Sequence, residues 1–330
     1  MGDDKNALAT VATLVIGSGL AGLTLASKLS IAGFGVVVVE KSPGVGGRLS
    51  TRQTEYGGFD HGAQYVTSRT QEFSELLARL NQAGSIAAWR PRGRDNGRTW
   101  WVGQPGMSNF VRPLAEGLDI RFSCEVTALR QLPQGIEVSL SGPDGRQDRL
   151  VAERVVAAIP APQAYRLLAD TDPVFAALVE VRIAPCWAGM VAFAAPVDDM
   201  IDIHRISDGS PLALIARNGS KPGRKGETYV LHASPAWSRD HLEDDPADVA
   251  LALYRAFEER LLITGGGPRG RPDSLKVHRW RYALTEVALG GPFLGDASGR
   301  VFACGDWCLE GRAEAAFLSG AALAEHLITL

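Results

Sequence analysis

Three glycines and one glutamate near the start of the chain have the types and spacing that a dinucleotide site requires. Gly17, Gly19 and Gly22 form G-x-G-x-x-G directly between a predicted strand and a predicted helix. The first glycine permits the tight turn, the second lets the main chain approach a pyrophosphate, and the third lets the helix pack on the strand. Glu40 ends the next predicted strand, where a carboxylate can accept hydrogen bonds from a ribose hydroxyl. Because a purely structural turn would not need this acid, the motif predicts dinucleotide binding.

The elements that position this motif form a strand–helix–strand unit over residues 11–40, and periodicity predicts the elements of the rest of the chain. Residues 89–101 have no periodicity and are predicted to be a loop. Helices are predicted at 71–84, 106–117, 163–169, 173–181, 246–263 and 313–328. Strands are predicted at 119–124, 125–131, 135–141, 154–160, 184–195, 227–234 and 276–282.

The two ends of the chain differ in pattern from its middle, where helices alternate with longer strands. We therefore predict that one domain is built from both ends of the chain and that a second domain is inserted in it. The first, cofactor-binding domain is predicted to comprise residues 1–70, 105–162 and 276–330. The substrate domain is predicted to comprise residues 71–104 and 163–275.

Composition and charge exclude several classes of function. The 330 residues are 45% hydrophobic and 22% charged, and their formal net charge is -3, so no global field recruits nucleic acid or an anionic membrane. The apolar run near the N-terminus leads straight into the glycine turn, which predicts a buried strand rather than a signal peptide. No apolar run approaches the length of about 18 residues that predicts a membrane span. We therefore expect a soluble, cytoplasmic protein.

Other common catalytic chemistries leave no motif in the chain. Its four cysteines are Cys124, Cys186, Cys304 and Cys308, which form no dense disulfide framework. No second ligand pair accompanies the last two, so no metal site is predicted. The nucleophile elbow G-x-S-x-G and the zinc motif H-E-x-x-H are both missing from the sequence. The pattern favours a redox enzyme whose cofactor carries the chemistry.

Two further segments narrow the kind of dinucleotide. "EKSPGVGGRLST" places Gly47 and Arg48 soon after Glu40, and the chain ends with "VFACGDWCLEGRAEAAFLSGAALAEHL". Both segments resemble the flavin-containing amine oxidoreductase superfamily. The resemblance implies an α/β fold: a Rossmann-like FAD-binding domain of the glutathione-reductase type with an inserted α+β substrate domain. It implies noncovalently held FAD, with Arg48 near the pyrophosphate and flavin, and Gly305 and Asp306 near the ribityl chain.

Within this superfamily the chain is similar to the bacterial branch of the renalase family. The similarity rests on "GGRLSTR", "GAQYVTSR", "WVGQPGMS", "AIPAPQAYRLL", "ARNGSKPGR", "LHASPAWSRDHL", "HRWRYA" and "CGDWCLEGRAEAAFLSG". It implies oxidation of dihydro-NAD(P) isomers that carry hydride at ring position 2 or 6, giving NAD(P)+ and, with O2, hydrogen peroxide. It also implies flavin contacts at Ala21, Arg48, Gln64 and Tyr65. Ala315 departs from the family, where glycine is usual.

These arguments predict two sets of site residues. The cofactor is predicted to bind at Gly17, Gly19, Leu20, Ala21, Gly22, Glu40, Lys41, Gly47, Arg48, Gln64, Tyr65, Val126, Gly305, Asp306, Glu314 and Ala315. The candidates for the substrate pocket, each of whose aromatic members could equally be a core residue, are Tyr65, Trp187, His232, Trp237, Trp280, Trp307 and Arg312. Small residues in the final helix are explained either by approach to a flat ring or by tight helix packing.

Two alternatives to the leading hypothesis stay open: a flavin-dependent amine oxidase, and a flavin-binding protein without turnover. Arg312 distinguishes the leading hypothesis from an amine oxidase. Amine oxidases of the superfamily usually carry an aromatic side chain at this position, as one wall of a cage for the amine. Two basic loops are open to two interpretations, phosphate binding and solvated charge. Their charged residues are Arg90, Arg92, Arg94 and Arg98 in one loop and Arg217, Lys221, Arg224 and Lys225 in the other. The preferred isomer, the choice of NAD or NADP and the oligomeric state are not predicted.

Overall fold

The computed structural model describes residues 8–93, 97–198, 201–267 and 270–330; Arg94 of the first basic loop lies outside them. The chain divides into two compact units, each assembled from segments that are distant in sequence. The first unit comprises Met1–Gly47, Leu114–Arg182 and Thr285–Leu330, and the second comprises Arg48–Pro113 and Ile183–Leu284. The boundaries predicted from the sequence separate a cofactor-binding domain from a substrate domain, and they stay a prediction.

The first unit is built on an eight-stranded sheet whose centre is parallel. Its main path runs β16 (Leu294–Gly295), β17 (Val301–Ala303), β10 (Gln147–Ala157), β1 (Ala9–Ile16), β2 (Val36–Val39) and β7 (Asp119–Arg121). Strands β8 (Glu125–Leu132) and β9 (Gly135–Ser141) extend it as an antiparallel hairpin on β10. The central strands are runs of buried valine, leucine and isoleucine, as expected for a parallel sheet covered on both faces.

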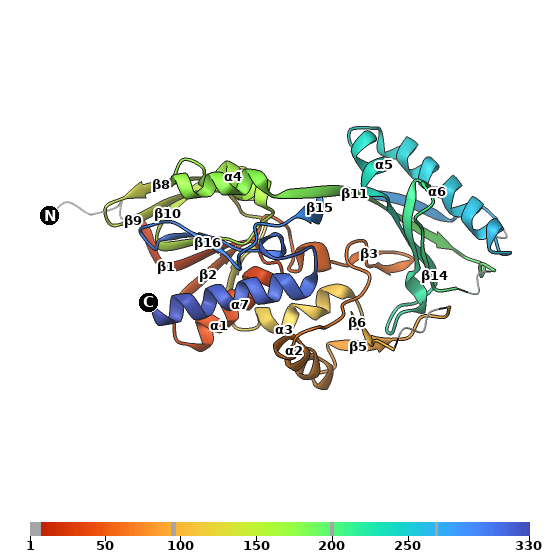
Figure 1. Ribbon diagram of the computed structural model, residues 1–330, viewed down its shortest axis with the longest axis horizontal. Coiled ribbons are helices and arrows are strands. Elements are labelled where there is room, and N and C mark those ends of the chain that lie inside the picture. The colour runs from red at the N-terminus through yellow and green to blue at the C-terminus, as the bar shows by residue number, and fades with distance from the viewer. Residues whose placement is uncertain (1–7, 94–96, 199–200, 268–269) are drawn as a thin grey trace. The chain divides into compact units, whose positions relative to one another are not determined.

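Two helices of the first unit, α1 (Leu20–Ile31) and α7 (Ala313–Thr329), lie side by side over this sheet (Figure 1). The two helices are so close at Gly320 of α7 that a Cβ there would lie only 2.3 Å from the carbonyl oxygen of Ala21 in α1. Tight helix packing therefore accounts for this glycine. The unit also contains α3 (Arg112–Ala115), which begins in the second unit, α4 (Ala161–Leu168), and 3-10 turns at Pro173–Glu180 and Asp306–Cys308.

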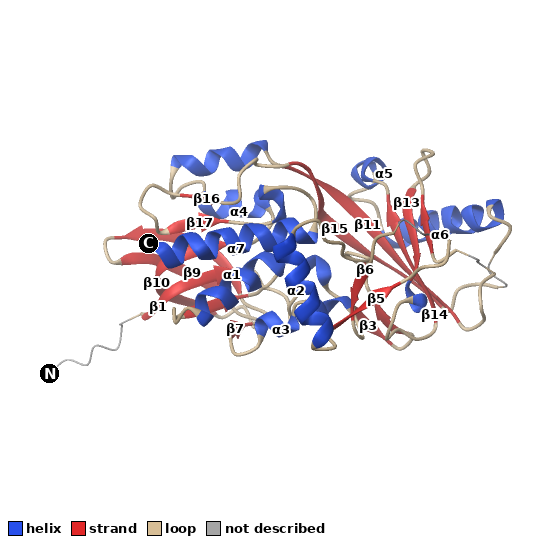
Figure 2. Ribbon diagram, turned by 60° about the horizontal axis from the view of Figure 1, so that its bottom comes forward, coloured by secondary structure: helices blue, strands red, loops and turns tan. Residues whose placement is uncertain are grey.

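The second unit is built on a five-stranded sheet with the order β12, β13, β14, β11 and β15 (Figure 2). These strands span Ile203–Arg205, Leu212–Arg217, Glu227–Ala233, Arg182–Phe193 and Ser274–Val287 in that order. Helix α6 (Pro246–Ile263) packs its buried residues against the sheet. Smaller elements complete the unit: α2 (Gln71–Gln82), α5 (Pro235–Asp240), the hairpin β3–β4 (Arg52–Thr54, Gly57–Phe59), and 3-10 turns at Gly47–Leu49, Met107–Phe110 and Asn218–Ser220.

One predicted element is wrong, and another is confirmed only in its middle. The predicted loop 89–101 contains no helix or strand at its described residues 90–93 and 97–99, but its ends belong to a hairpin of β5 (Ile86–Trp89) and β6 (Trp100–Gly103), in which Trp89 and Trp100 are buried. The predicted helix 106–117 is a 3-10 turn, Met107–Phe110, followed by the short helix α3. Asp60 accepts the main-chain N–H of Met107 at 2.9 Å, and this long-range contact fixes the turn at the start of the segment.

Candidate functional site

The glycine turn of the first unit fits a dinucleotide pyrophosphate. Gly17 has φ 102°, and a Cβ there would lie 2.7 Å from the carbonyl oxygen of Ala158. A Cβ at Gly22 would lie 2.1 Å from the carbonyl oxygen of Gly17, whereas one at Gly19 would meet no atom of the chain within 4 Å. The fold itself therefore requires the first and third glycines. The second is the one at which a ligand can approach the main chain and the free N–H groups that begin α1.

Glu40 connects the glycine turn to the loop that follows β2. Its carboxylate accepts the main-chain N–H of Ser18 at 2.8 Å, the hydroxyl of Ser18 at 2.9 Å and the N–H of Ser42 at 2.8 Å. A carboxylate has about four acceptor positions, so one position is left for a ribose hydroxyl. The same loop returns to the turn, where the Gly46 N–H donates to Ser18 O at 3.0 Å and a Cβ on Gly47 would lie 3.7 Å from Gly19 Cα.

The C-terminal Gly-Asp motif is held by side chains of the same unit. Ser319 accepts the N–H of Gly305 at 2.9 Å and donates to the carbonyl of Pro292 at 2.6 Å. Buried Asp306 accepts the hydroxyl of Thr285 at 3.2 Å. Trp307 is fully buried, its indole N–H donates to Ile159 O at 3.0 Å, and it lies against Gly305. This predicted pocket residue thus fixes the turn that carries the motif.

Arg312 occupies the N-cap of α7, and acidic groups flank it on both sides. Its guanidinium lies 3.7 Å from a carboxylate oxygen of Glu310 and 3.6 Å from one of Glu314. The Glu314 side chain is 3% exposed and that of Arg312 is 22% exposed. The positive charge that the sequence places here is therefore partly balanced. Of the remaining predicted cofactor residues in this unit, Leu20, Ala21 and Ala315 are buried, Val126 is half-buried, and Lys41 is exposed.

In the second unit, a fully buried carboxylate holds two buried cations. Asp60 accepts Lys221 Nζ at 3.2 Å and the guanidinium of Arg224, together with the hydroxyl of Thr51 at 2.8 Å. Burial opposes ionisation, but Lys221 and Arg224 hold the pKa of Asp60 below its ordinary value. Burial also lowers the pKa of Lys221 to about 8, against the opposing charge of Asp60.

Three of the predicted second-unit residues meet around His61. The carbonyl of His61 accepts the indole N–H of Trp280 at 3.0 Å and lies 3.3 Å from Nε2 of His232. Gln64 Nε2 lies 3.4 Å from the same His232 nitrogen. The ring of His61 stacks on Trp280 at 5.1 Å between centroids and meets His278 edge-on at 4.8 Å.

The three imidazoles of this group are uncharged at neutral pH. Burial lowers the pKa of His61, His232 and His278 to about 4 in each case. For His61 and His278, the charge of Arg52 lowers the pKa further, and for His232 the charge of Lys221 does so. His61 and Trp280 thus form a stacked, uncharged aromatic pair, and His278 stands edge-on to both rings, beside Arg52.

The other predicted residues of the second unit have different side-chain partners. Tyr65 stacks on Trp100, with ring centroids 3.8 Å apart. Trp237 stacks on His241 at 4.1 Å and packs on the core beneath α6. Trp187 is buried in that core. Arg48 donates to the carbonyl of Ala283 at 3.1 Å.

Of the seven described charges in the basic loops, Arg217, Lys221 and Arg224 are not exposed, whereas the other four are: Arg90, Arg92, Arg98 and Lys225. Arg92 pairs with Asp202 at 2.7 Å, and Arg217 pairs with Glu227 at 2.6 Å. Lys221 and Arg224 are buried on Asp60, as described above. Neither interpretation of these loops anticipated internal carboxylates as partners, because all but one of those partners lie far away in the sequence.

Sequence reasoning missed Asp60, His61 and His278 as members of the site. Asp60 and His61 directly precede the "GAQY" motif, and His278 lies two residues before Trp280 on β15. Because side chains alternate along a strand, positions 278 and 280 lie on one face, and this pairing could have been predicted from the sequence. The contact of these two residues with His61 depends on the fold.

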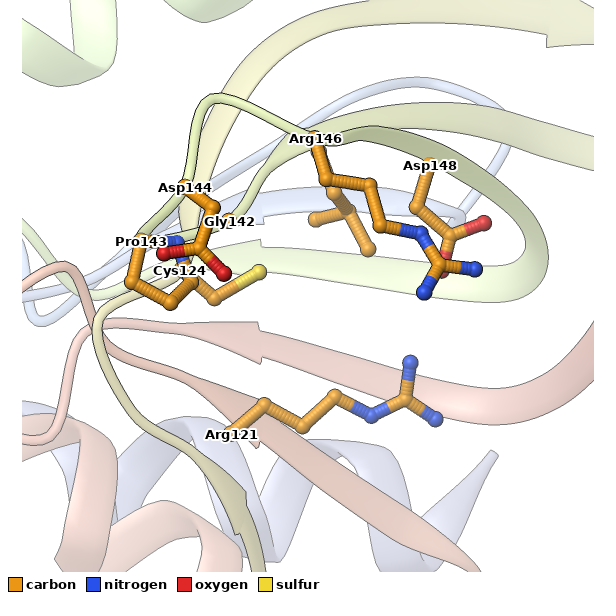
Figure 3. Close-up of a pocket in the computed structure, with 8 residues that line it drawn as sticks. Arg121, Cys124, Gly142, Pro143, Asp144, Arg146 and Asp148 are labelled. Atoms are coloured by element: carbon orange, nitrogen blue, oxygen red, sulfur yellow. The ribbon is translucent and has the colours of Figure 1, made fainter.

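A cavity of about 340 Å³ in the first unit lies elsewhere (Figure 3). Cys124 lies beside the turn between β9 and β10, and Arg121 lies apart from them on β7. None of the predicted site residues lines this cavity. Within the described ranges, no three His, Cys, Asp or Glu side chains are grouped to hold a metal ion. No described helix is long and apolar enough to cross a membrane.

Comparison with known proteins assigns the chain to a class. Residues 15–80 match the NAD(P)-binding Rossmann-like domain, and residues 88–328 match the flavin containing amine oxidoreductases. The chain therefore belongs to the family of flavin-containing amine oxidoreductases. Its α/β fold, with a Rossmann-like cofactor-binding part and an amine-oxidase-type substrate part, is as predicted.

Solved structures share this fold at low sequence identity. A protein from Exiguobacterium sp. 255-15 assigned as a protoporphyrinogen oxidase is 12% identical with a TM-score of 0.74, covering 97% of this chain and 99% of that one. Wild-type putrescine oxidase bound to putrescine is 13% identical, with a TM-score of 0.69 and the same coverage. Cyclohexylamine oxidase from Brevibacterium oxydans IH-35A is 14% identical, with a TM-score of 0.67 and again the same coverage.

Proposed function

We propose that this chain holds FAD noncovalently and oxidises dihydronicotinamide dinucleotides that carry their hydride at ring position 2 or 6. The family supports a flavin. Among flavins, Gly19 and Glu40 support FAD over FMN, because only FAD carries the pyrophosphate and the adenosine ribose that these residues fit. Bound FAD supplies a hydride acceptor, and O2 then takes two electrons from it to give hydrogen peroxide.

Buried thiols support noncovalent binding. Burial raises the pKa of Cys308 to about 12 and that of Cys304 well above its ordinary value. A thiol must ionise to act as a nucleophile, so neither cysteine beside the Gly-Asp motif is suited to form a thioether. Acid precipitation should release the flavin into the supernatant, and yellow colour that stays with the pellet would contradict this.

Arg312 is the observation that carries the choice of substrate class. An aromatic wall for an amine is missing where this arginine begins α7. Hydride loss makes the nicotinamide ring aromatic, and no proton has to leave the substrate. Groups that orient a flat ring and phosphates are therefore sufficient. The stacked, uncharged pair of His61 and Trp280 supports the same choice, because it offers an aromatic environment and no charged imidazole at neutral pH.

Anaerobic bleaching of the bound flavin tests the proposal. We expect rapid reduction by the 2- or 6-dihydro isomer and far slower reduction by ordinary 4-dihydro NAD(P)H. Equal rates with all three isomers, or reduction by the 4-isomer alone, would indicate an ordinary NAD(P)H oxidase. No reduction by any donor would indicate a flavin-binding protein without turnover.

Amine oxidation is the second candidate, and one observation favours it. Because Glu310 and Glu314 lie close to Arg312, the charge of the guanidinium repels a protonated amine less than an isolated arginine would. Only the missing aromatic wall then argues against an amine. If common monoamines or polyamines bleach the flavin within seconds, the dinucleotide assignment is wrong and this candidate replaces it.

A further inference from the structure

The second unit buries more positive than negative charge next to the segment Asp60–Tyr65. The side chains of Lys221, Arg224 and Asp60 are 0%, 1% and 0% exposed, so two cations share one carboxylate. An uncompensated buried charge costs several kcal/mol unless further contacts offset it. Lys221 makes such a contact outside the carboxylate, since its Nζ donates to Gln64 Oε1 at 2.9 Å.

This contact fixes which way the Gln64 carboxamide points. Lysine only donates and carbonyls only accept, so the oxygen of the amide must face Lys221 and its nitrogen must face the carbonyls. Nε2 lies 2.5 Å from Asp60 O and 2.9 Å from Gly62 O. Both N–H groups of Gln64 therefore hold the main chain of its own turn, and Lys221 holds Gln64.

The turn of residues 60–65 is packed against the main chain of Arg48. The N–H of Ala63 donates to Arg48 O at 2.9 Å, and a Cβ at Gly62 would lie 2.1 Å from that oxygen. We infer that Lys221 is a positioning residue of the proposed flavin site, acting through Gln64 to fix the main chain of residues 60–65. The inference rests on the proposed function in one respect, that this turn contacts the flavin.

A pair of matched variants tests it. Lys221→Met leaves Arg224 and Asp60 as a balanced pair, so the chain is expected to fold. Arg224→Met removes the same charge from the same carboxylate, but Arg224 donates to Asp60, Gly103 and Pro222 and not to Gln64. In the purified chain without flavin, hydrogen exchange at residues 62–65 should become at least about tenfold faster in Lys221→Met only. Equal exchange in both variants would overturn the positioning role.

FAD affinity, measured by titrating the flavin-free chain, tests the link to the site. Lys221→Met should weaken FAD binding about tenfold, the scale of one hydrogen bond, whereas Arg224→Met should change it less than about twofold. In a chain that already carries Gln64→Leu, Lys221→Met should weaken FAD binding little further. If the two substitutions instead cause additive losses of FAD affinity, Lys221 does not act through Gln64. If the unmodified chain binds no FAD, the proposed function fails; exchange that still differs would then confine Lys221 to positioning the turn.

Discussion

Glu40 of the first unit and Asp60 of the second are buried carboxylates that each organise a turn, and they are held in opposite ways. Glu40 of the first unit accepts three neutral donors, all from Ser18 and Ser42. Asp60 of the second unit accepts two cations whose positions lie 161 and 164 residues away. Glu40 keeps acceptor capacity for a ligand, whereas Asp60 is saturated. A buried acid beside a motif is therefore a proposed ligand contact in one unit and a structural anchor in the other.

The largest effect is expected from removing the charge of Asp60. Asp60→Asn leaves Lys221 and Arg224 buried without a carboxylate, which should cost about 3–5 kcal/mol in the free energy of unfolding. Urea unfolding measures it. The double variant Asp60→Asn with Lys221→Met removes one buried cation and should regain part of the loss. If it is no more stable than the single variant, buried charge is not the cause.

Acid should weaken the second unit through its imidazoles. The pKa of His61 is about 4 in the fold, against about 6.5 when unfolded. Between pH 4 and 6.5 the unfolded chain therefore binds more protons at this residue than the folded chain does. The contribution of His61 to the free energy of unfolding is fully present above pH 6.5 and is lost as the pH falls to 4. His61 contributes at most about 3 kcal/mol of this loss, and half-buried His278 contributes less because solvent screens it.

Stability measured at pH 7 and pH 4.5 checks this dependence. In His61→Met the loss between the two pH values should be smaller than in the unmodified chain. An unchanged loss would show that carboxylates, and not this imidazole, govern the acid response.

Glu40→Ala should weaken FAD retention more than it harms the chemistry of flavin that stays bound. The lost group is a ribose acceptor worth about 1.5–3 kcal/mol as a charged hydrogen bond, or roughly tenfold to a hundredfold in the dissociation constant. Fluorescence titration with FAD measures the affinity. Glu40→Gln keeps one acceptor oxygen and should lose less. A fully occupied Glu40→Ala variant whose flavin is not reduced would contradict the ribose role.

The smallest effect is expected at Trp307. Trp307→Phe removes the indole N–H that donates to Ile159 O and leaves this partly buried carbonyl without that donor, which should cost about 1–2 kcal/mol. Thermal unfolding measures the change. Trp280→Phe, which removes the donor to His61 O, is the matched variant in the second unit. The absorbance of bound flavin should change more in Trp280→Phe than in Trp307→Phe. The opposite result would contradict the structural role assigned to Trp307 and the pocket role assigned to Trp280.

The local features of this protein could be predicted from its sequence. The glycine spacing, Glu40 and the apolar strands around them act over about thirty residues, so their pattern was sufficient to predict the turn and α1, and it is the basis for the proposed dinucleotide site. Helix α6 was predicted at its observed bounds because its apolar spacing and its N-terminal Asp245 and Pro246 are local signals. Most strands of both sheets were predicted for the same reason.

The pairs of charges and aromatic rings that are in contact depend on the tertiary fold. Lys221 and Arg224 sit in a loop whose composition is typical of solvent, and the fold buries them on Asp60. His61 joins His232 and Trp280 across 171 and 219 positions, and Trp307 belongs to the core of the first unit. Such pairings depend on which strands become neighbours, and strand order is set by the packing of the whole chain rather than by any local pattern.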